Sequence, residues 1–151
     1  MRVVIQRVKR AKVVTNDKVV GEINQGLLLL VGFTDNDSLK DIEYMVNKII
    51  NLRIFDDGAG VMNLSVADIN GSILSVSQFT LYASIKKGRR PSYEQSLNRN
   101  EALILYQLFN KKLKDTNLHI ETGAYGEEME VKLINDGPVT IIIDSKDSSN
   151  N

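Results

Sequence analysis

The stretch Gly26-Leu27-Leu28-Leu29-Leu30-Val31-Gly32 decides the fold class of this chain. Its apolar residues follow one another without alternation, and a glycine stands at each end. An aperiodic apolar run of this length is typical of a strand that is buried on both faces. We therefore expect Leu27–Val31 to lie inside a sheet that is covered on both sides.

Further strands are predicted on either side of this run, because β-branched and apolar segments alternate there with turn signals. Asn16-Asp17 and Asn24-Gln25-Gly26 separate the first three strands, and Asp56–Gly60 forms another turn. The predicted strands besides Leu27–Val31 are Val3–Val14, Lys18–Ile23, Ile73–Tyr82, Leu118–Ala124, Met129–Asn135 and Val139–Asp144.

Two helices are predicted between the strands. Ser38 and Asp41 form a helix-start signal, and Asn98-Arg99-Asn100-Glu101 resembles a capping box. The apolar residues after each signal share one helical stripe. They are Ile42, Met45, Val46, Ile49 and Ile50 in the first helix, and Ala102, Leu105, Tyr106, Phe109 and Leu113 in the second. The short turns imply mostly antiparallel pairing, and only the strand–helix–strand connections leave room for parallel pairs.

The composition indicates one small domain and excludes several chemistries. The chain has 151 residues, with one histidine and no cysteine. This length suits a single domain, expected at residues 1–144 and followed by a loose polar tail at residues 145–151. The lack of cysteine excludes disulfides, thiolate metal sites and a cysteine nucleophile. Phosphate-loop and zinc-protease motifs are also absent, so we expect no metal and no cofactor.

Charge and hydropathy limit the partners. The 19 basic and 19 acidic residues cancel, which excludes a strongly polycationic nucleic-acid binder but not a local basic patch. The chain has no run of about 18 apolar residues, so we expect no membrane-spanning helix. The opening residues become polar too early for a signal peptide. We therefore expect a cytoplasmic protein without a membrane partner.

The orientation of Arg7 has two interpretations. Val3, Ile5 and Arg7 share strand parity, so an apolar face continues into an arginine. A bulge after Ile5 would turn Arg7 outward. An inward Arg7 would need a partner, because a lone buried charge is very costly. The residue pattern leaves both interpretations open.

Two segments have unusual polar patterns. Ser77-Gln78-Phe79-Thr80-Leu81-Tyr82-Ala83 ends an apolar strand with three hydrogen-bonding residues, and alternation would place Ser77 and Phe79 on one side and Gln78 and Thr80 on the other. The purely structural interpretation of this segment is a strand end that leaves the core. Asn135-Asp136-Gly137-Pro138-Val139-Thr140 interrupts another apolar segment, so it must be an edge, a turn or a bulge. A plain trans turn and a deliberate cis peptide bond are both open there.

Two further features allow both a structural and a functional interpretation. Lys86-Lys87-Gly88-Arg89-Arg90 is either a solvated loop or a phosphate contact. His119 alternates with Leu118 and Ile120, so it is predicted to be a strand residue that faces water or a polar neighbour. A catalytic His119 would instead indicate a small-molecule esterase or amidase.

These segments together resemble the D-aminoacyl-tRNA deacylase family, first called D-tyrosyl-tRNA deacylase. The resemblance covers Met1 to about Asp144. It departs from the family pattern at Ser84, where an aspartate is usual, and at Tyr125-Gly126-Glu127-Glu128-Met129, where a Phe-Gly-Ala segment is usual. The matching segments are Met1–Val8, Asn51–Phe55, Met62–Val66, Ser77–Ala83, Lys87–Ser92 and Asn135–Thr140.

The resemblance implies an α/β fold: a single small domain whose mostly antiparallel sheet is curled into a barrel-like body with two packed helices. It implies a homodimeric, tRNA-binding hydrolase that cleaves the ester of D-aminoacyl-tRNA, or of glycine mischarged on tRNA-Ala, in translation quality control. The alternative is an RNA-binding module without catalysis, in which the basic loop matters and Thr80 does not.

The resemblance also implies roles for individual residues. Backbone N–H groups around Phe79 and Thr80 would stabilise an oxyanion, while Ser77 and Gln78 hold the adenosine. Thr80 would act as nucleophile or would position water, and assistance by the ribose hydroxyl is the favoured mechanism because no base lies nearby in the sequence. Gly137 and Pro138, as a cis pair from the partner subunit, would exclude L-amino acids. The residues implied in support are Arg7, which orients this pair, and Met129, a wall of the pocket. From their charge, Lys86, Lys87, Arg89 and Arg90 are expected to contact tRNA phosphate.

Overall fold

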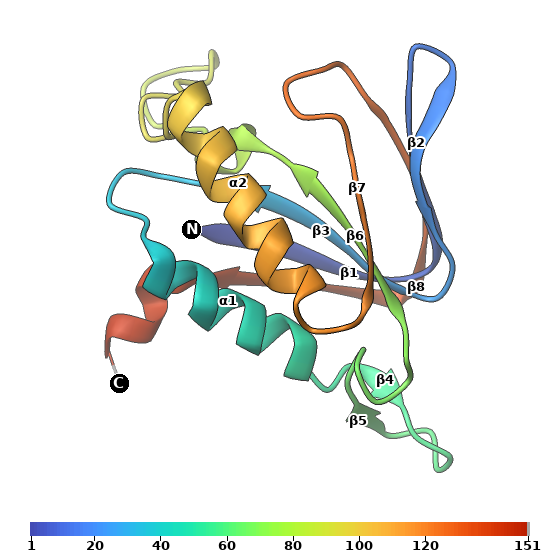
Figure 1. The fold of residues 1–151 in the computed structure, drawn as a ribbon. Helices are drawn as coiled ribbons and strands as arrows, with labels where there is room; N and C mark the ends of the chain where they lie inside the picture. The colour runs from blue at the N-terminus through green and yellow to red at the C-terminus, as the bar shows by residue number, and fades with distance from the viewer. Residues whose placement is uncertain (151) are drawn as a thin grey trace.

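The computed structural model describes residues 1–150, and its first feature is one curled sheet with two helices on one face (Figure 1). Strand β1 lies inside the sheet and pairs antiparallel with β2, β3 and β8. The pairs β3–β6 and β6–β7 are parallel, as expected for the strand–helix–strand connections. The elements are β1 (Arg2–Thr15), β2 (Lys18–Ile23), β3 (Gly26–Gly32), α1 (Leu39–Asn51), β4 (Phe55–Asp56), β5 (Met62–Leu64), β6 (Ser72–Ser77), the 3₁₀ helix η1 (Phe79–Tyr82), α2 (Arg99–Lys114), β7 (His119–Thr122), β8 (Glu130–Asp144) and the 3₁₀ helix η2 (Ser145–Asn150).

The sheet is curled until it is nearly closed, like a barrel. Gly21 in β2 shows how closely the two ends of the sheet approach each other. A Cβ atom at Gly21 would lie 2.5 Å from the carbonyl oxygen of Thr122 in β7. No side chain fits at such a distance, so a glycine is needed where the sheet closes.

The central strand β3 is covered on both faces, which confirms the prediction for Leu27–Val31. Leu27 and Leu29 pack toward α1 and α2, whereas Leu28 points into the curl of the sheet, and all three are at most 1% exposed. Both helices also begin where predicted. The carboxylate of Asp41 accepts from the N–H of Ser38, and the side chain of Asn98 accepts from the N–H of Glu101.

The predicted strand Ile73–Tyr82 is wrong in its second half. Strand β6 ends at Ser77 and the chain turns into η1. The N–H of Leu81 bonds to the carbonyl of Gln78, which closes the first turn of η1. Strand alternation therefore does not describe Phe79 and Thr80, because these residues are not in a strand.

The predicted order of strands also needs correction. The hairpin β4–β5 surrounds the predicted turn at Asp56–Gly60, and its two strands were not predicted from the sequence. Met129–Asn135 and Val139–Asp144 are not two strands, because β8 runs through Gly137 and Pro138. The β1–β8 register shifts on both sides of Val8, so Gly137 and Pro138 lie in a bulged part of β8.

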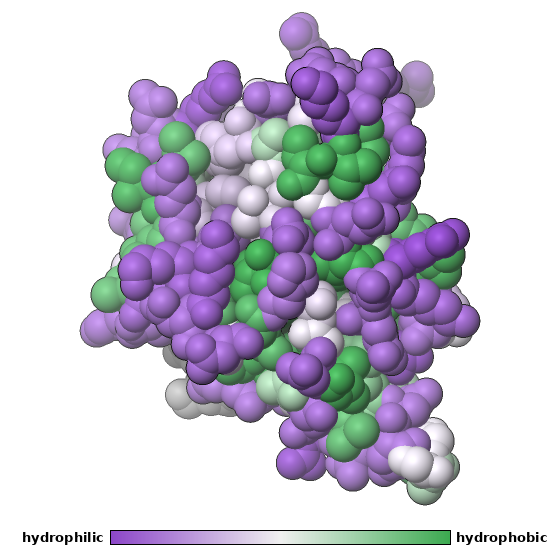
Figure 2. All heavy atoms as spheres, turned by 45° about the vertical axis from the view of Figure 1, so that its right-hand side comes forward, coloured by the Kyte–Doolittle hydropathy of each residue, from purple (hydrophilic) through white to green (hydrophobic). Residues whose placement is uncertain are grey.

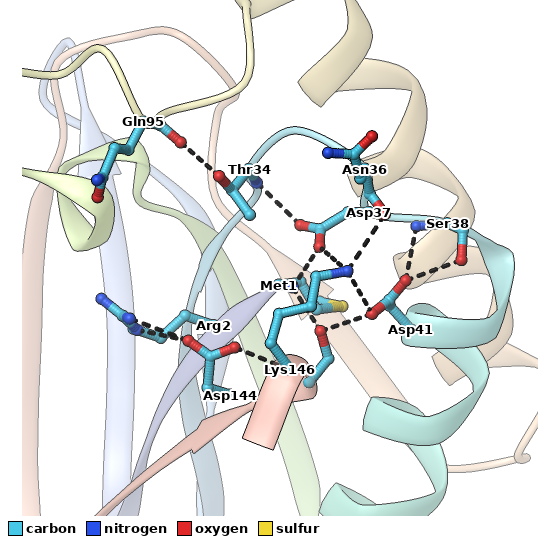
Figure 3. Close-up of polar contacts among 11 residues, drawn as sticks. Met1, Arg2, Thr34, Asn36, Asp37, Ser38, Asp41, Gln95, Asp144 and Lys146 are labelled. Carbon is cyan, nitrogen blue, oxygen red and sulfur yellow. Dashed lines mark hydrogen bonds and ion pairs between the residues drawn. The ribbon is translucent and has the colours of Figure 1, made fainter. Parts of the chain in front are cut away.

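The start of the predicted loose tail is anchored. Ser145 is buried, and its hydroxyl donates to Asp41. The ammonium of Lys146 lies 2.9 Å from the Asp41 carboxylate and 3.2 Å from that of Asp37 (Figure 3). These contacts tie the end of β8 to the first turn of α1. The boundary at residue 144 remains a prediction, and residue 151 lies outside the described residues.

Candidate active site

A cavity of about 540 Å³ opens where the parallel strands β3 and β6 end. The carboxyl ends of parallel strands meet at one edge of a sheet, a common place for ligand sites. The cavity collects Ser77, Gln78, Phe79 and Met129 from the predicted site. Its other lining residues are Val31, Gly32, Phe33, Val76, Leu97, Arg99, Ala102, Tyr125, Gly126, Glu127 and Val131.

Helix η1 reaches the cavity because Gly32 leaves room for it. The N–H of Gln78 still bonds to the carbonyl of Val31 at 2.8 Å, as a last rung of the β3–β6 ladder. A Cβ at Gly32 would lie 2.9 Å from the carbonyl oxygen of Gln78 and 3.2 Å from the side chain of Leu81. A larger residue at position 32 would therefore displace η1 from the strand.

The backbone N–H groups of Phe79 and Thr80 are available to a ligand. They precede the first internal bond of η1, in which Leu81 donates to Gln78. Within residues 1–150 neither N–H has a hydrogen-bond acceptor. Two adjacent free donors are a suitable arrangement for the negative oxygen of a tetrahedral intermediate.

Thr80 does not line the cavity but is linked to it through Gln78. The side-chain nitrogen of Gln78 donates to the hydroxyl of Thr80 at 2.6 Å. An amide accepts no proton near neutral pH, so it cannot activate a threonine nucleophile. Among the described residues lining the cavity, Glu127 is the only carboxylate and none is a histidine. The geometry thus favours a positioning role for Thr80.

The loop that carries the four basic residues is attached to η1. The hydroxyl of Ser96 donates to the carbonyl of Phe79 at 2.9 Å, and the ring of Tyr93 meets the ring of Phe79 edge-on at 5.1 Å. Backbone bonds between Ser84 and Ser92 close the loop. All four basic side chains, Lys86, Lys87, Arg89 and Arg90, are exposed at its tip.

Tyr106 supports β6, the strand whose end lines the cavity, and this contact was not predicted from the sequence. Tyr106 of α2 is buried, and its hydroxyl donates to the carbonyl of Ser75 in β6 at 2.8 Å. Burial raises the pKa of this hydroxyl, so it stays protonated and keeps donating. Its ring lies 5.7 Å from that of Tyr125. The sequence showed Tyr106 as one of several apolar helix positions, and nothing in that pattern marked it as a link to β6.

Arg7 points inward, which decides between its two interpretations. It is 7% exposed, and its guanidinium donates to the carbonyls of Ile54 and Asp136. The carboxylates of Asp136 and Asp56 lie 3.5 Å and 3.6 Å away. The pairing of β1 with β3 is regular from Arg2 to Val8, so Arg7 keeps the face of Val3 and Ile5.

Gly137 and Pro138 lie beside Arg7 and are joined by a cis peptide bond. A Cβ at Gly137 would lie 3.2 Å from the Arg7 guanidinium. Neither residue lines the cavity. Arg7 pairs with Leu27 at the first half of β3, whereas the cavity begins at Val31. One chain therefore does not bring the two motifs together.

His119 lies away from the cavity. It stands at the start of β7 with its side chain 62% exposed, 3.2 Å from the carboxylate of Glu121. An esterase that uses His119 as its base is therefore not supported. The described residues contain no cluster that could hold a metal ion. In the same part of the chain, neither long helix has the length and hydropathy needed to cross a membrane.

Comparison with known sequences gives consistent matches along the chain. The family described as D-Tyr-tRNA(Tyr) deacylase matches residues 4–144. A D-aminoacyl-tRNA deacylase of Geobacillus sp. (strain WCH70) is 52% identical over 151 residues, covering 100% of this chain and 99% of the relative. One from Thermosipho africanus (strain TCF52B) is 56% identical over 146 residues, covering 97% and 98%.

Solved structures share the fold. A protein named c-Myc DNA Unwinding Element Binding Protein has a TM-score of 0.90 at 38% identity, covering 95% of this chain and 98% of its own. A probable eukaryotic D-amino acid tRNA deacylase has a TM-score of 0.81 at 19% identity, covering 94% and 97%. The curled sheet with two helices is thus a recurring fold.

The fold and these relatives define the protein as a small α/β hydrolase that acts on an ester bond. The chain belongs to the D-Tyr-tRNA(Tyr) deacylase family. This confirms the family resemblance, the enzyme class and the fold that the sequence motifs predicted.

Proposed function

We propose that the protein cleaves the ester between a D-amino acid and the terminal adenosine of tRNA, and also removes glycine mischarged on tRNA-Ala. The observation that carries this proposal is the pair of free N–H groups on η1 beside a cavity without a histidine. An aminoacyl ester is already activated, so its hydrolysis requires oxyanion stabilisation and a directed water more than a strong base. The activity would serve chiral proofreading of translation in the cytoplasm.

In this mechanism Ser77 and Gln78 hold the adenosine, and the N–H groups of Phe79 and Thr80 stabilise the oxyanion. The neighbouring ribose hydroxyl assists the attack of water on the ester carbonyl. Thr80 positions the reactants through its bond to Gln78. The lack of a proton acceptor next to Thr80 supports this division of roles.

Selection of the D-form would come from Gly137 and Pro138 of a second subunit. In one chain these residues lie beside Arg7, whose register partner on β3 is Leu27, and the cavity begins at Val31, roughly 13 Å further along β3 at about 3.3 Å per residue. The pair therefore reaches an active site only in an assembly. Its carbonyls would crowd the α-carbon and leave no room for an L side chain, whereas glycine would pass. Arg7 would orient the pair, and Met129 would form a wall of the pocket.

A homodimer is supported by the exposed surface of β8. Among the described strands, β8 pairs only with β1, so its other edge has no strand partner. Ile134 and Ile142 on this strand are 42% and 66% exposed. On the face of the molecule drawn in Figure 2, hydrophobic groups lie between hydrophilic ones. An unpaired edge with exposed apolar residues favours association with a second copy.

The basic loop would bind the tRNA backbone. Its four exposed cations are held close to Phe79, and cations that contact phosphate contribute affinity without reading sequence. The same loop would also serve the alternative function, an RNA-binding module without catalysis, but the hydrolase family of the chain favours the enzyme.

Hydrolysis of matched substrates separates the two functions. The protein should release D-tyrosine or D-aspartate from tRNA and leave the L-aminoacyl forms intact. Equal rates on the D- and L-forms would contradict the chiral mechanism. Binding of tRNA without any hydrolysis would favour the RNA-binding module.

A further inference from the structure

Arg99 is a lining residue of the cavity whose charge the proposed mechanism does not use. It is the first residue of α2, and its guanidinium donates to the carbonyl of Gly126 at 3.3 Å. The hydroxyl of Tyr125 donates to the backbone carbonyl of Arg99 at 2.7 Å. These two bonds connect the start of α2 with the segment that precedes Met129 and hold Arg99 at the cavity.

The charge of Arg99 is not neutralised by the protein. No carboxylate of the described residues forms an ion pair with its guanidinium. Glu127 lines the same cavity, but its carboxylate accepts from the hydroxyl of Thr15 at 3.1 Å. A cation is also unfavourable at the start of a helix, so the backbone of α2 does not compensate the charge.

Gly126 leaves the space that Arg99 occupies. Its φ is +74°, and a Cβ at this position would lie 2.3 Å from a terminal nitrogen of Arg99. Any other residue at position 126 would displace the guanidinium. With one donor on Gly126, the remaining N–H groups of the guanidinium are available for an acceptor outside the chain.

We propose that Arg99 binds the phosphate on the 5′ side of the terminal adenosine, an inference that rests on the proposed placement of this adenosine in the cavity. The phosphate that joins the adenosine to the rest of the tRNA must leave the cavity past its lining residues. A guanidinium suits this role because its planar set of donors matches two phosphate oxygens. This contact is separate from the basic loop, which is attached to Phe79.

The test compares adenosine with adenosine 5′-monophosphate as ligands in a calorimetric titration. The wild-type protein should bind the monophosphate about tenfold more tightly, because a charge-assisted contact is added. Arg99→Gln should bind the two ligands equally and keep the wild-type affinity for adenosine. Arg99→Lys should keep part of the preference, since it retains the charge. Arg53→Gln is the matched control, because Arg53 is an exposed arginine that does not line the cavity.

Kinetics on D-aminoacyl-tRNA give a second measurement. Arg99→Gln should raise KM severalfold and leave kcat unchanged, because the contact does not involve the reacting atoms. Equal affinity of the wild-type protein for both ligands, or a retained preference in Arg99→Gln, would overturn the inference. Failure of the wild-type protein to bind either ligand would overturn it as well. Deacylation of D-aminoacyl-tRNA is measured on the same preparation. If it is normal, only the inference on Arg99 fails; if it is absent, the proposed function fails as well.

Discussion

The carboxylate of Asp144, at the end of β8, lies 2.9 Å from the guanidinium of Arg2, at the start of β1 (Figure 3). The same guanidinium donates to the carbonyl of Leu81 at 2.8 Å and lies 4.8 Å from the ring centre of Tyr82. Leu81 and Tyr82 both belong to η1. Two distant parts of the chain thus hold the segment that presents the free N–H groups.

We expect Arg2→Ala to lower kcat by about ten- to a hundredfold, because misplacement of a catalytic segment by about 1 Å is that costly. The free energy of unfolding should fall by only about 1 kcal/mol, since Arg2 is partly exposed. Steady-state kinetics and denaturant unfolding measure the two effects. Lys111→Ala removes a comparable exposed ion pair with Asp115 and should change neither. Wild-type kcat in Arg2→Ala would contradict a positioning role.

Removal of the Thr80 hydroxyl tests how the ester is attacked. If the ribose hydroxyl assists, Thr80→Ala should slow D-aminoacyl-tRNA turnover less than about tenfold, and Thr80→Ser should restore the rate. Single-turnover assays on D-aminoacyl-tRNA measure this step directly. A loss of three orders of magnitude or more would identify Thr80 as the nucleophile instead.

The basic loop should determine the salt dependence of tRNA binding. Replacing Lys86, Lys87, Arg89 and Arg90 with glutamine should flatten the plot of log affinity against log salt by about 0.7–0.9 for each phosphate that the loop no longer neutralises. Titrations of tRNA at several salt concentrations measure the slope. Glutamine at Lys111, Lys112 and Lys114, at the far end of α2, provides a control that changes charge elsewhere. An unchanged slope in the loop variant would show that the loop is only solvated surface.

A methyl group added at Gly137 should destabilise the fold locally and should also impair the reaction. The φ of Gly137 is +127°, where an L side chain is strained, and the new Cβ would lie 2.7 Å from a methyl of Val139. We expect Gly137→Ala to destabilise the protein by about 1–3 kcal/mol and to lower D-selectivity. Unfolding curves and D- versus L-aminoacyl-tRNA rates measure these effects. Wild-type rates and selectivity in a folded Gly137→Ala protein would contradict the role assigned to this residue.

The stability of the protein should depend on the ionised form of Asp41. Burial raises the pKa of this carboxyl, but hydrogen bonds from Lys146, Ser145 and Ser38 outweigh burial and lower it below its ordinary value of 3.8. A lowered pKa in the folded state means that the stabilisation is present above pH 4 and is lost as the pH falls further.

Asp41→Asn should therefore be less stable than the wild-type protein by about 2 kcal/mol at pH 7, as expected for hydrogen bonds to a charged group. The difference should narrow as the pH falls from about 5 to 2. Urea unfolding at a series of pH values measures it. A difference that stays constant over this range would show that the charge of Asp41 contributes nothing.

Local patterns predicted much of the fold. Leu27–Val31 has no neighbouring polar residues to direct one face to water, and Ser38 and Asn98 cap the helices that they precede. The strand break at Gln78 was not predictable from Ile73–Tyr82, which is uniformly favourable for a strand. It arises because β3 ends at Gly32 and β7 ends at Thr122, so the N–H of Gln78 makes the last bond to β3 and no strand pairs with the chain beyond it.

For the site, the amino-acid sequence was sufficient to predict the chemical groups and the family. The sequence alone contains the motifs at Ser77–Ala83 and Asn135–Thr140. It also shows that no histidine is near them in the chain. The arrangement of these groups depends on how the strands and helices pack together. This packing placed Arg7 inward, separated Gly137 from the cavity, brought Arg99 to the cavity and bonded Tyr106 to β6. The physical reason is that periodicity and capping depend on neighbours within a few residues. A cavity wall depends instead on strand pairing and close backbone approach between segments that are far apart in the sequence.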